Sequence, residues 1–370
     1  MKVEIVSGIW PPDVGGPATH APELAAWLRK HGHVVEALVT ADHAPGPQPY
    51  PVRWVSRRLP VGVRHAEVVR RLAARGRRAD VVYATSMLGR SAAATALTHT
   101  PLVLKVTSDP AFERAHRRGA VDGAVADFQD TDGGAFVGAL RLARDATVRR
   151  AAHLVCPSSF MAGLAVSWGV PAERVTVLPN PAPRRDEAAT VELDARPALV
   201  FAGRMTAAKG LRVLLHALAD VPEATLTLVG DGEERGSLEA LASQLGLERR
   251  TRFVGARPRA EVLGLMAAAD AVVLTSAWEN FPHGLVEALA MGTPVIATRV
   301  GGVPEIVAHG ENGLLAEPGN PAAFAAAVNR FLGDEELGSR LRTAAAASVA
   351  RFDQDAVYGR LEQILVEAAG

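Results

Sequence analysis

The chain has 370 residues, more than a single hydrophobic core usually organises, so we expect two domains. Apolar residues make up 48% of the chain and charged residues 22%, which excludes a disordered or fibrous protein. The formal net charge is zero, but residues 1–182 carry 22 Lys and Arg against 15 Asp and Glu, whereas residues 183–370 carry 18 against 25. The chain therefore joins a basic half to an acidic half.

The chain has a single cysteine, Cys156, which excludes a disulfide framework and favours a reducing cytoplasm as its location. The stretch from Arg53 to Arg78 holds nine arginines and one acidic residue, Glu67. This charge can form an ordinary solvated helix face, or it can attract phosphate groups or the anionic inner face of a membrane. Nucleic acid is not an expected partner, because Trp54 is the one Phe, Trp or Tyr there that could stack on bases.

Short apolar runs alternate with helical patterns in the first half, which predicts strands buried on both faces of a parallel sheet. The expected strands are residues 2–7, 34–40, 80–85, 102–107, 153–157 and 174–178. The run from Val177 to Pro183 then places three prolines in five residues and stops regular structure. We therefore predict a linker there and a first domain of residues 1–182.

The alternation restarts after the linker, which predicts a second Rossmann-like domain of residues 183–352. Its expected strands are residues 198–202, 224–229, 251–254, 271–275 and 293–298, and its expected helices are residues 211–219, 233–245, 259–268 and 284–291. Three further helices are expected at residues 321–332, 335–350 and 353–368, the last packing back on the first domain within about residues 353–370. The predicted fold class is α/β, with two doubly wound domains that face a cleft, where ligands of such sheets bind.

Two glycines, Gly15 and Gly16, follow the first expected strand and stand directly before a helix. Without side chains, they let backbone N–H groups come close to an anion at the positive end of that helix. A plain tight turn is the alternative interpretation.

Two cations share one expected strand-to-helix loop in the second half, in the stretch F-A-G-R-M-T-A-A-K-G. Arg204, directly after Gly203, offers a planar fork of donors, and Lys209 offers a compact point charge. Both suit a pyrophosphate group, although a chance pair of surface cations is the alternative. The glycine-rich run from Gly230 to Gly236 does not fit a dinucleotide fingerprint, because its last glycine comes one residue too late. We expect that run to close a strand and begin a helix.

Two glutamates, Glu279 and Glu287, lie eight positions apart in W-E-N-F-P-H-G-L-V-E-A-L-A-M-G. Glu279 is expected in a loop, and Glu287 in the first turn of a helix, where the helix dipole favours a carboxylate. Pro282 keeps the preceding backbone extended, so that the free N–H groups at the helix start can meet a ligand. The alternative is that the helix dipole alone accounts for Glu287, while Glu279 is solvated.

With these motifs the chain resembles the retaining glycosyltransferases of family four, which have the two-domain GT-B fold. The resemblance rests on the cation loop, the two glutamates, the loop G-G-P-A-T-H, and T-P-V-I-A-T-R-V-G-G-V-P-E-I-V followed by N-G-L-L. It implies transfer of a sugar from a nucleotide-diphosphate sugar to an acceptor hydroxyl, with no metal ion or other cofactor. The pair His31 and His33 is accordingly interpreted as structural rather than as a metal site.

The resemblance also implies roles for single residues. Arg204 and Lys209 would bind the diphosphate and stabilise it as it leaves, Glu279 would hold the donor sugar, and Glu287 would hold the ribose. The nucleobase would lie against the backbone from Val254 to Arg257. Further contacts to phosphate and sugar would come from Gly16, Gly203, Phe281, Pro282, His283, Gly284 and Leu285.

One position departs from the family pattern. Many relatives carry a histidine that reaches the donor sugar after the strand equivalent to residues 102–107, and here the sequence reads V-L-K-V-T-S-D-P. Asp109, or else Lys105, would have to take its place. The long segment 112–136 that follows is expected to shape the acceptor site, since such insertions are usually functional.

We therefore expect a retaining hexosyltransferase that acts in the biosynthesis of a polysaccharide, a glycolipid or a small glycoside. A nucleotide-sugar epimerase, a sugar phosphorylase or an inactive donor-binding partner on the same fold are the alternatives. The acceptor is open between a lipid-linked sugar, a phosphorylated polyol and a neutral small molecule. Peripheral contact with a membrane through the basic first domain is also open.

Overall fold

The structure is a computed structural model that describes residues 1–13, 16–121, 125–193 and 195–370. The chain divides into two compact units, which we call unit 1 and unit 2. Unit 1 consists of Met1–Asn180 together with Asp355–Gly370, and unit 2 is Pro181–Gln354. The division falls within the proline-rich run, close to the expected boundary after residue 182.

Unit 1 contains a seven-stranded sheet whose strands are all parallel. The strands, in spatial order, are β3 (Val52–Ser56), β2 (Val34–Ala41), β1 (Lys2–Ser7), β4 (Val81–Ala84), β5 (Leu102–Lys105), β6 (His153–Cys156) and β7 (Val175–Val177). The helices are α1 (Gly16–Lys30), α2 (Val61–Gly76), α3 (Leu88–Thr98), α4 (Pro110–His116), α5 (Gly134–Arg149), α6 (Ser159–Ser167) and α13 (Gln354–Ala369). The strand order reverses between β1 and β4, which makes their carboxyl ends a switch point where ligands bind in such sheets.

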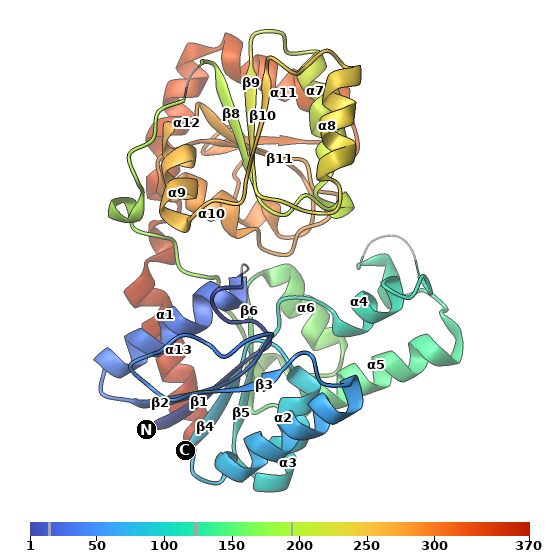
Figure 1. Cartoon of the computed structure of the whole chain (residues 1–370), viewed down its shortest axis with the longest axis vertical. Helices are drawn as coiled ribbons and strands as arrows, with labels where there is room; N and C mark the ends of the chain where they lie inside the picture. Colours follow the sequence, from blue (N-terminus) through green and yellow to red (C-terminus); the bar gives the residue numbers. More distant parts are fainter. Residues whose placement is uncertain (14–15, 122–124, 194) are drawn as a thin grey trace. The chain divides into compact units, whose positions relative to one another are not determined.

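Helices cover both faces of this sheet, because strand residues point alternately to opposite sides. Val3 and Ile5 of β1 belong to the core under α1 and α13, and Val6 belongs to the core under α2, α3 and α6. Figure 1 shows α13, drawn in red, beside the blue helix α1, where Tyr358 and Leu361 join the first of these cores. The C-terminal helix thus packs on unit 1.

Unit 2 contains a six-stranded sheet, also entirely parallel. Its strands, in spatial order, are β10 (Thr251–Gly255), β9 (Thr225–Val229), β8 (Ala198–Ala202), β11 (Ala271–Leu274), β12 (Val295–Thr298) and β13 (Gly313–Ala316). Its helices are α7 (Leu211–Ala219), α8 (Arg235–Gln244), α9 (Arg259–Ala268), α10 (His283–Ala290), α11 (Pro321–Gly333) and α12 (Glu335–Ser348). The switch point lies between β8 and β11.

The fold class predicted from the sequence is confirmed, since each unit is a parallel sheet flanked by helices (Figure 1). Two strands were not predicted. β3 is a five-residue edge strand interrupted by Arg53, and β13 is a four-residue edge strand, so neither is a long apolar run. The start of α10 is a correction: it begins at His283 rather than Gly284, which places Glu287 in the second turn and not the first.

Short 3-10 turns complete the chain and lie at Asp127–Gln129, Ala172–Arg174, Arg185–Glu187, Ala207–Lys209, Val303–Glu305 and Ala350–Phe352. None of the helices in the described part of the chain is long and apolar enough to cross a membrane.

Candidate functional site

Two strand-to-helix connections meet at the switch point of unit 2. One follows β8 and the other follows β11, and these two strands are hydrogen-bonded neighbours. The Thr275 hydroxyl donates to the carbonyls of Lys209, at 3.1 Å, and Gly210, at 3.0 Å. The amide of Ala277 donates to the carbonyl of Ala208 at 2.9 Å. These bonds hold the cation loop against the loop that carries Glu279.

The glycine after Lys209 is required by this contact. Gly210 has a φ of +61°, and a Cβ added to it would lie 2.3 Å from the carbonyl oxygen of Thr275. A side chain there would therefore push the two loops apart, in addition to the strain of the left-handed backbone. The K-G pair of the sequence motif thus serves a close approach of backbones.

Lys209 and Glu279 form an ion pair, with Nζ 2.5 Å from Oε1. The hydroxyl of Ser276 donates to the same oxygen at 2.6 Å, so Oε1 is engaged twice. Among the described residues, none donates to Oε2, and the Glu279 side chain is 10% exposed. Glu279 therefore positions the lysine with one oxygen and has the other available as an acceptor.

The backbone of Glu279 is held by the loop that follows β12. The amide of Gly302 donates to the Glu279 carbonyl at 3.1 Å. Gly301 has a φ of +47°, and a Cβ on it would lie 1.8 Å from that carbonyl oxygen. The G-G pair after β12 thus fixes the loop in which Glu279 stands.

Arg204 is exposed at the other end of the cation loop. Its neighbour Gly203 donates its amide to Val229, at 2.9 Å, and Met205 donates to Asp231, at 2.8 Å. The glycine turn after β9 packs directly on this segment, because a Cβ on Gly230 would lie 2.0 Å from the carbonyl oxygen of Gly203. The glycine-rich run therefore supports the cation loop.

The N-terminus of α10 lies at the same edge of the sheet, because α10 follows β11. Pro282 precedes the helix in an extended conformation, and no described side chain caps the helix. Leu285 donates its amide to the Pro282 carbonyl at 3.1 Å. Phe281 contributes its ring to the core, where it packs edge-on against Phe352 with ring centroids 5.6 Å apart. The start of α10 is thus a helix terminus that can receive an anion.

Glu287 lies one turn further into α10 and is partnered by Arg259, whose Nη1 lies 3.1 Å from Oε1. Burial raises the pKa of Glu287, the negative charge of Glu187 adds to this, and Arg259 opposes it. Sequence reasoning missed Arg259. It is the first residue of α9, a position where the helix dipole disfavours a cation, and this signal could have pointed to a carboxylate partner.

The end of β10 completes this edge. Val254 is partly buried and Arg257 is exposed, and the carbonyl of Gly255 accepts a bond from the amide of Gly230 at 2.9 Å. Because all six strands are parallel, the connections after β8, β9, β10, β11 and β12 leave the sheet at one edge. The structure therefore brings the predicted residues of unit 2 together at one edge.

In unit 1, Gly16 is the first residue of α1 and is partly exposed, and Gly15 lies outside the described residues.

His20 is buried and its Nε2 lies 3.0 Å from the Tyr83 hydroxyl and 3.3 Å from Nζ of Lys105. The amine of Lys105 also donates to Asn180. Burial lowers the pKa of Lys105 to about 7.

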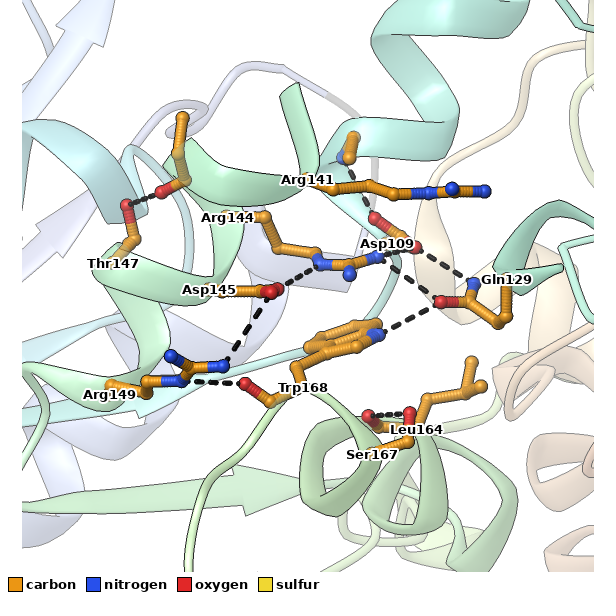
Figure 2. Close-up of polar contacts among 12 residues, drawn as sticks. Asp109, Gln129, Arg141, Arg144, Asp145, Thr147, Arg149, Leu164, Ser167 and Trp168 are labelled. Carbon is orange, nitrogen blue, oxygen red and sulfur yellow. Dashed lines mark hydrogen bonds and ion pairs between the residues drawn. The ribbon is translucent and has the colours of Figure 1, made fainter. Parts of the chain in front are cut away.

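Asp109 lies in a buried network, shown in Figure 2. Its Oδ1 accepts from the amides of Ala111 and Phe112, at 2.8 and 3.2 Å, and so caps α4. Its Oδ2 accepts from Nη1 of Arg144 at 2.6 Å and from Nε2 of Gln129 at 3.0 Å. Protein groups thus occupy both carboxylate oxygens, as is typical of a residue that stabilises the fold. The role predicted for Asp109 at the donor sugar stays a prediction.

The same network holds the long segment that follows β5. The indole of Trp168 donates to Oε1 of Gln129 at 3.0 Å, and Figure 2 shows its ring beneath the Arg144 guanidinium, 4.3 Å from ring centroid to Cζ. A small separate core of Ala111, Ala115, Val121, Phe128 and Val137 packs the rest of the segment. Its residues 122–124 lie outside the described part of the chain.

A hollow between β3 and α2 is lined by Trp54, Leu59, Val63, Glu67 and Arg70, among others. Glu67 pairs with Arg70 at 2.7 Å and with Arg71 at 2.5 Å. Part of the arginine-rich stretch is therefore neutralised within α2.

Two family models match the chain in succession. The model of the glycosyl transferase 4-like domain matches residues 15–181, and the model of the glycosyl transferases group 1 matches residues 184–348. A solved structure of Anabaena HepE with UDP-glucose aligns with a TM-score of 0.79 at 25% identity, covering 98% of this chain and 99% of that one. A sucrose-phosphate synthase of Thermosynechococcus elongatus aligns with a TM-score of 0.81 at 20% identity, covering 99% and 98%.

Among curated proteins, a lipopolysaccharide core biosynthesis glycosyltransferase of Rhizobium meliloti (strain 1021) is 35% identical over 170 residues, which are 46% of this chain and 49% of that protein. A D-inositol 3-phosphate glycosyltransferase of Corynebacterium efficiens is 35% identical over 180 residues, 46% of this chain and 42% of that protein. The chain spans about half the length of the curated relatives it matches.

Two Rossmann-like units, each with its switch point at the carboxyl ends of a parallel sheet, define the GT-B class of folds. With both family models matched in order, the chain belongs to the GT4-type glycosyltransferases.

Proposed function

We propose that the chain transfers a sugar from a nucleoside-diphosphate sugar to an acceptor hydroxyl, with retention of the anomeric configuration. The observation that carries the proposal is the Lys209–Glu279 pair at the switch point of unit 2, with the exposed Arg204 on the same loop as Lys209. The complexes of HepE with UDP, with UDP and glucose and with UDP-glucose support a nucleotide sugar as the donor. The resulting enzyme is a hexosyltransferase of carbohydrate biosynthesis.

In this proposal Arg204 and Lys209 bind the diphosphate and stabilise the charge that develops on it as it leaves. Glu279 holds Lys209 in place with Oε1 and accepts from a hydroxyl of the donor sugar with Oε2. The lysine is thus positioned before the donor binds, so its placement costs no reorganisation in the transition state.

The nucleoside is assigned to the neighbouring residues. Glu287, oriented by Arg259, accepts from the ribose hydroxyls, and the base lies against the backbone from Val254 to Arg257. The amides from Phe281 to Leu285, together with those of Gly203 and Gly16, contact phosphate and sugar. Two cationic side chains and a helix N-terminus supply the positive charge that the diphosphate needs, so we propose that the reaction requires no metal ion.

The acceptor belongs to unit 1, where we place it near the segment anchored by the Asp109 network. We also propose that unit 1 contacts an anionic membrane face peripherally through α2, because Val61 and Val63 are 59% and 55% exposed beside the arginines of this helix. Such contact would bring the enzyme to a lipid-linked acceptor. Sedimentation with vesicles that contain phosphatidylglycerol, against vesicles of neutral lipid, tests this contact.

The test of the proposed function starts with a thermal-shift screen of nucleoside diphosphates and their sugars, since a ligand of the folded state raises the apparent melting temperature. The best donor is then incubated alone and with acceptors, and nucleotide release and anomeric configuration are followed by NMR. Release of the nucleoside diphosphate with a retained anomer is expected. Conversion of the donor to an epimer, release of a sugar phosphate, or binding without turnover in every condition would contradict the proposal.

A further inference from the structure

Four basic side chains of unit 1 lie on three helices, α2, α3 and α4, which follow the strands β3, β4 and β5. We call these side chains the basic cluster, and its members are Arg64 and His65 of α2, Arg90 of α3 and Arg114 of α4. α3 packs against α2 and against α5, and α5 packs against α4 (Figure 1). Each of these helices except α5 follows a strand of the sheet closely, so the cluster stands at the carboxyl edge of that sheet.

The members of the cluster are close enough to repel one another. Burial, together with the positive charges of Arg64 and Arg114, lowers the pKa of Arg90 to about 10. Burial also lowers the pKa of His65, and the charges of Arg90, Arg64 and Arg114 add to that effect. The folded protein thus keeps like charges together at a cost in stability.

Several other cations of unit 1 are neutralised by carboxylates. Arg53 pairs with Glu4 at 2.7 Å, and Arg57 pairs with Asp13 at 2.8 Å. In the part of the chain that the structure describes, no carboxylate forms an ion pair with a member of the basic cluster. The cluster thus differs from Arg53, Arg57, Arg70 and Arg71, each of which is held by a carboxylate.

Two carboxylates on the surrounding helices are committed elsewhere. Glu67 of α2 is held by two arginines of its own helix, and Asp109 at the start of α4 is held by Arg144. Glu113 of α4 is exposed. Arg64 donates one nitrogen, Nη1, to a backbone carbonyl at 2.8 Å, which leaves its other donors for a ligand.

The helix ends increase the positive potential. Arg90 is the third residue of α3, and Arg64 is the fourth of α2, so both stand at the positive ends of helices of 11 and 16 residues. Neither first turn contains an acidic residue, and no described side chain caps either helix. A cation at the N-terminal end of a helix is unfavourable, because the helix dipole is positive there. An anion bound between these side chains would be attracted both by the cations and by the helix ends.

We propose that the basic cluster binds the phosphate group of a phosphorylated acceptor substrate. This inference rests on the proposed function and specifies the class of its acceptor. A phosphate monoester carries up to two negative charges and several acceptor oxygens, which matches a site of guanidinium groups and helix N-termini. The acceptor hydroxyl would then be presented at the carboxyl edge of unit 1.

The first test measures anion binding at the basic cluster through the pKa of His65 and does not depend on catalysis. The imidazole of His65 is titrated by NMR in the full chain, with inorganic phosphate or with sodium chloride at equal ionic strength, and its signal is assigned with His65→Asn. Phosphate is expected to raise the pKa of His65 more than chloride does, because bound negative charge favours the protonated ring. Arg90→Gln should remove this difference, and the control Arg75→Gln, at the other end of α2, should retain it.

An equal response to phosphate and chloride, or an unchanged response in Arg90→Gln, would overturn the inference. Two further titrations separate the sources of the phosphate. A response to glycerol 1-phosphate supports a soluble acceptor, and a response to vesicles with phosphatidic acid, but not to neutral vesicles, supports a lipid acceptor. If neither probe raises the pKa of His65, the site does not bind phosphate monoesters and the inference fails.

The second test uses turnover with the best donor. Arg90→Gln should raise the KM for a phosphorylated acceptor about tenfold or more, as expected from the loss of a charge-assisted contact, and should leave the KM for the donor unchanged. Acceptors without phosphate should be used equally poorly by the native and variant enzymes. If the native chain consumes no nucleotide sugar, the proposed function fails while the titration of His65 still reports on the anion site.

Discussion

Lys209 and Glu279 are joined by an ion pair of 2.5 Å between residues 70 positions apart in the chain. The pair closes two loops that leave neighbouring strands of unit 2 at the switch point of the sheet. Because Ser276 donates to the same carboxylate oxygen, the geometry of the lysine is set by two partners rather than by solvent. A cation held in this way is preorganised for an anionic leaving group.

Removing either member of this pair should stop transfer without unfolding the protein. Lys209→Ala is expected to lower turnover about 100- to 1000-fold, the usual loss when one preorganised group that stabilises charge is removed. Glu279→Gln should abolish transfer as well, because it frees the lysine and weakens the acceptor for the sugar. Glu279 is largely buried and Lys209 is partly exposed, so the free energy of unfolding should fall by about 1–3 kcal/mol, which leaves the protein folded.

Nucleotide release measures turnover, and urea denaturation measures the free energy of unfolding. Arg212→Ala is the matched control, since Arg212 is an exposed cation on α7, just beyond the same loop. It should retain full activity. Turnover near that of the native protein in Lys209→Ala or Glu279→Gln, with any nucleotide sugar, would refute the roles assigned to them.

Gly301 should be intolerant of any side chain. Gly301→Ala would place a Cβ 1.8 Å from the carbonyl oxygen of Glu279, whereas Gly246→Ala has the same left-handed backbone, with a φ of +68°, and no atom within 4 Å. Gly246→Ala should cost only the backbone strain, about 1–2 kcal/mol. Gly301→Ala should cost about 1–3 kcal/mol more, as overpacking does. It should also weaken donor binding, which isothermal titration calorimetry measures; equal losses in both variants would contradict the assigned contact.

Asp109→Ala should destabilise unit 1 by about 3–5 kcal/mol, because it breaks the buried ion pair with Arg144 and leaves Asp145 as the carboxylate that still pairs with that arginine. The double variant Asp109→Ala/Arg144→Met removes both charges and should regain much of this stability. Urea denaturation measures the free energy of unfolding in each protein.

The same pair of variants decides between a structural and a catalytic role for Asp109. If its carboxylate acts on the donor sugar, as the sequence predicted, the double variant recovers stability but not turnover. If its role is to anchor the segment after β5, turnover returns together with stability. A loss of turnover in the double variant that exceeds any change in donor binding would support the catalytic role.

The stability of unit 1 should rise with pH between about 7 and 10.5. Burial lowers the pKa of Lys105 in the folded protein to about 7, from an ordinary 10.5. In this window the unfolded chain binds a proton at Lys105 that the folded chain does not, so raising the pH favours folding, by up to about 1.4 kcal/mol per pH unit. Below pH 7 both states are protonated and the contribution is constant.

Urea denaturation at pH 7.5, 8.5 and 9.5 measures this slope. Lys105→Met should reduce it, and Lys30→Met, which changes an exposed lysine of α1, should leave it as in the native protein. The same slope in Lys105→Met and in the native protein would show that another group titrates.

The sequence by itself determined the fold class and the motifs of unit 2. Apolar runs such as residues 198–202 and 271–275, buried on both faces, leave few alternatives to a parallel sheet, and periodicity reports this directly. The spacing of Arg204 and Lys209 within one loop, and of Glu279 and Glu287 around Pro282, was visible for the same reason: each set lies within a short local segment.

Only the tertiary structure decided which groups meet across the chain. Arg259 reaches Glu287 from another helix, Arg144 and Gln129 occupy the carboxylate of Asp109, and arginines of three helices gather at one edge. None of these contacts follows from periodicity, because they depend on the order in which strands join the sheet and on the burial that results. Charge in a sequence identifies possible partners, and packing determines which cations are neutralised and which remain for a ligand.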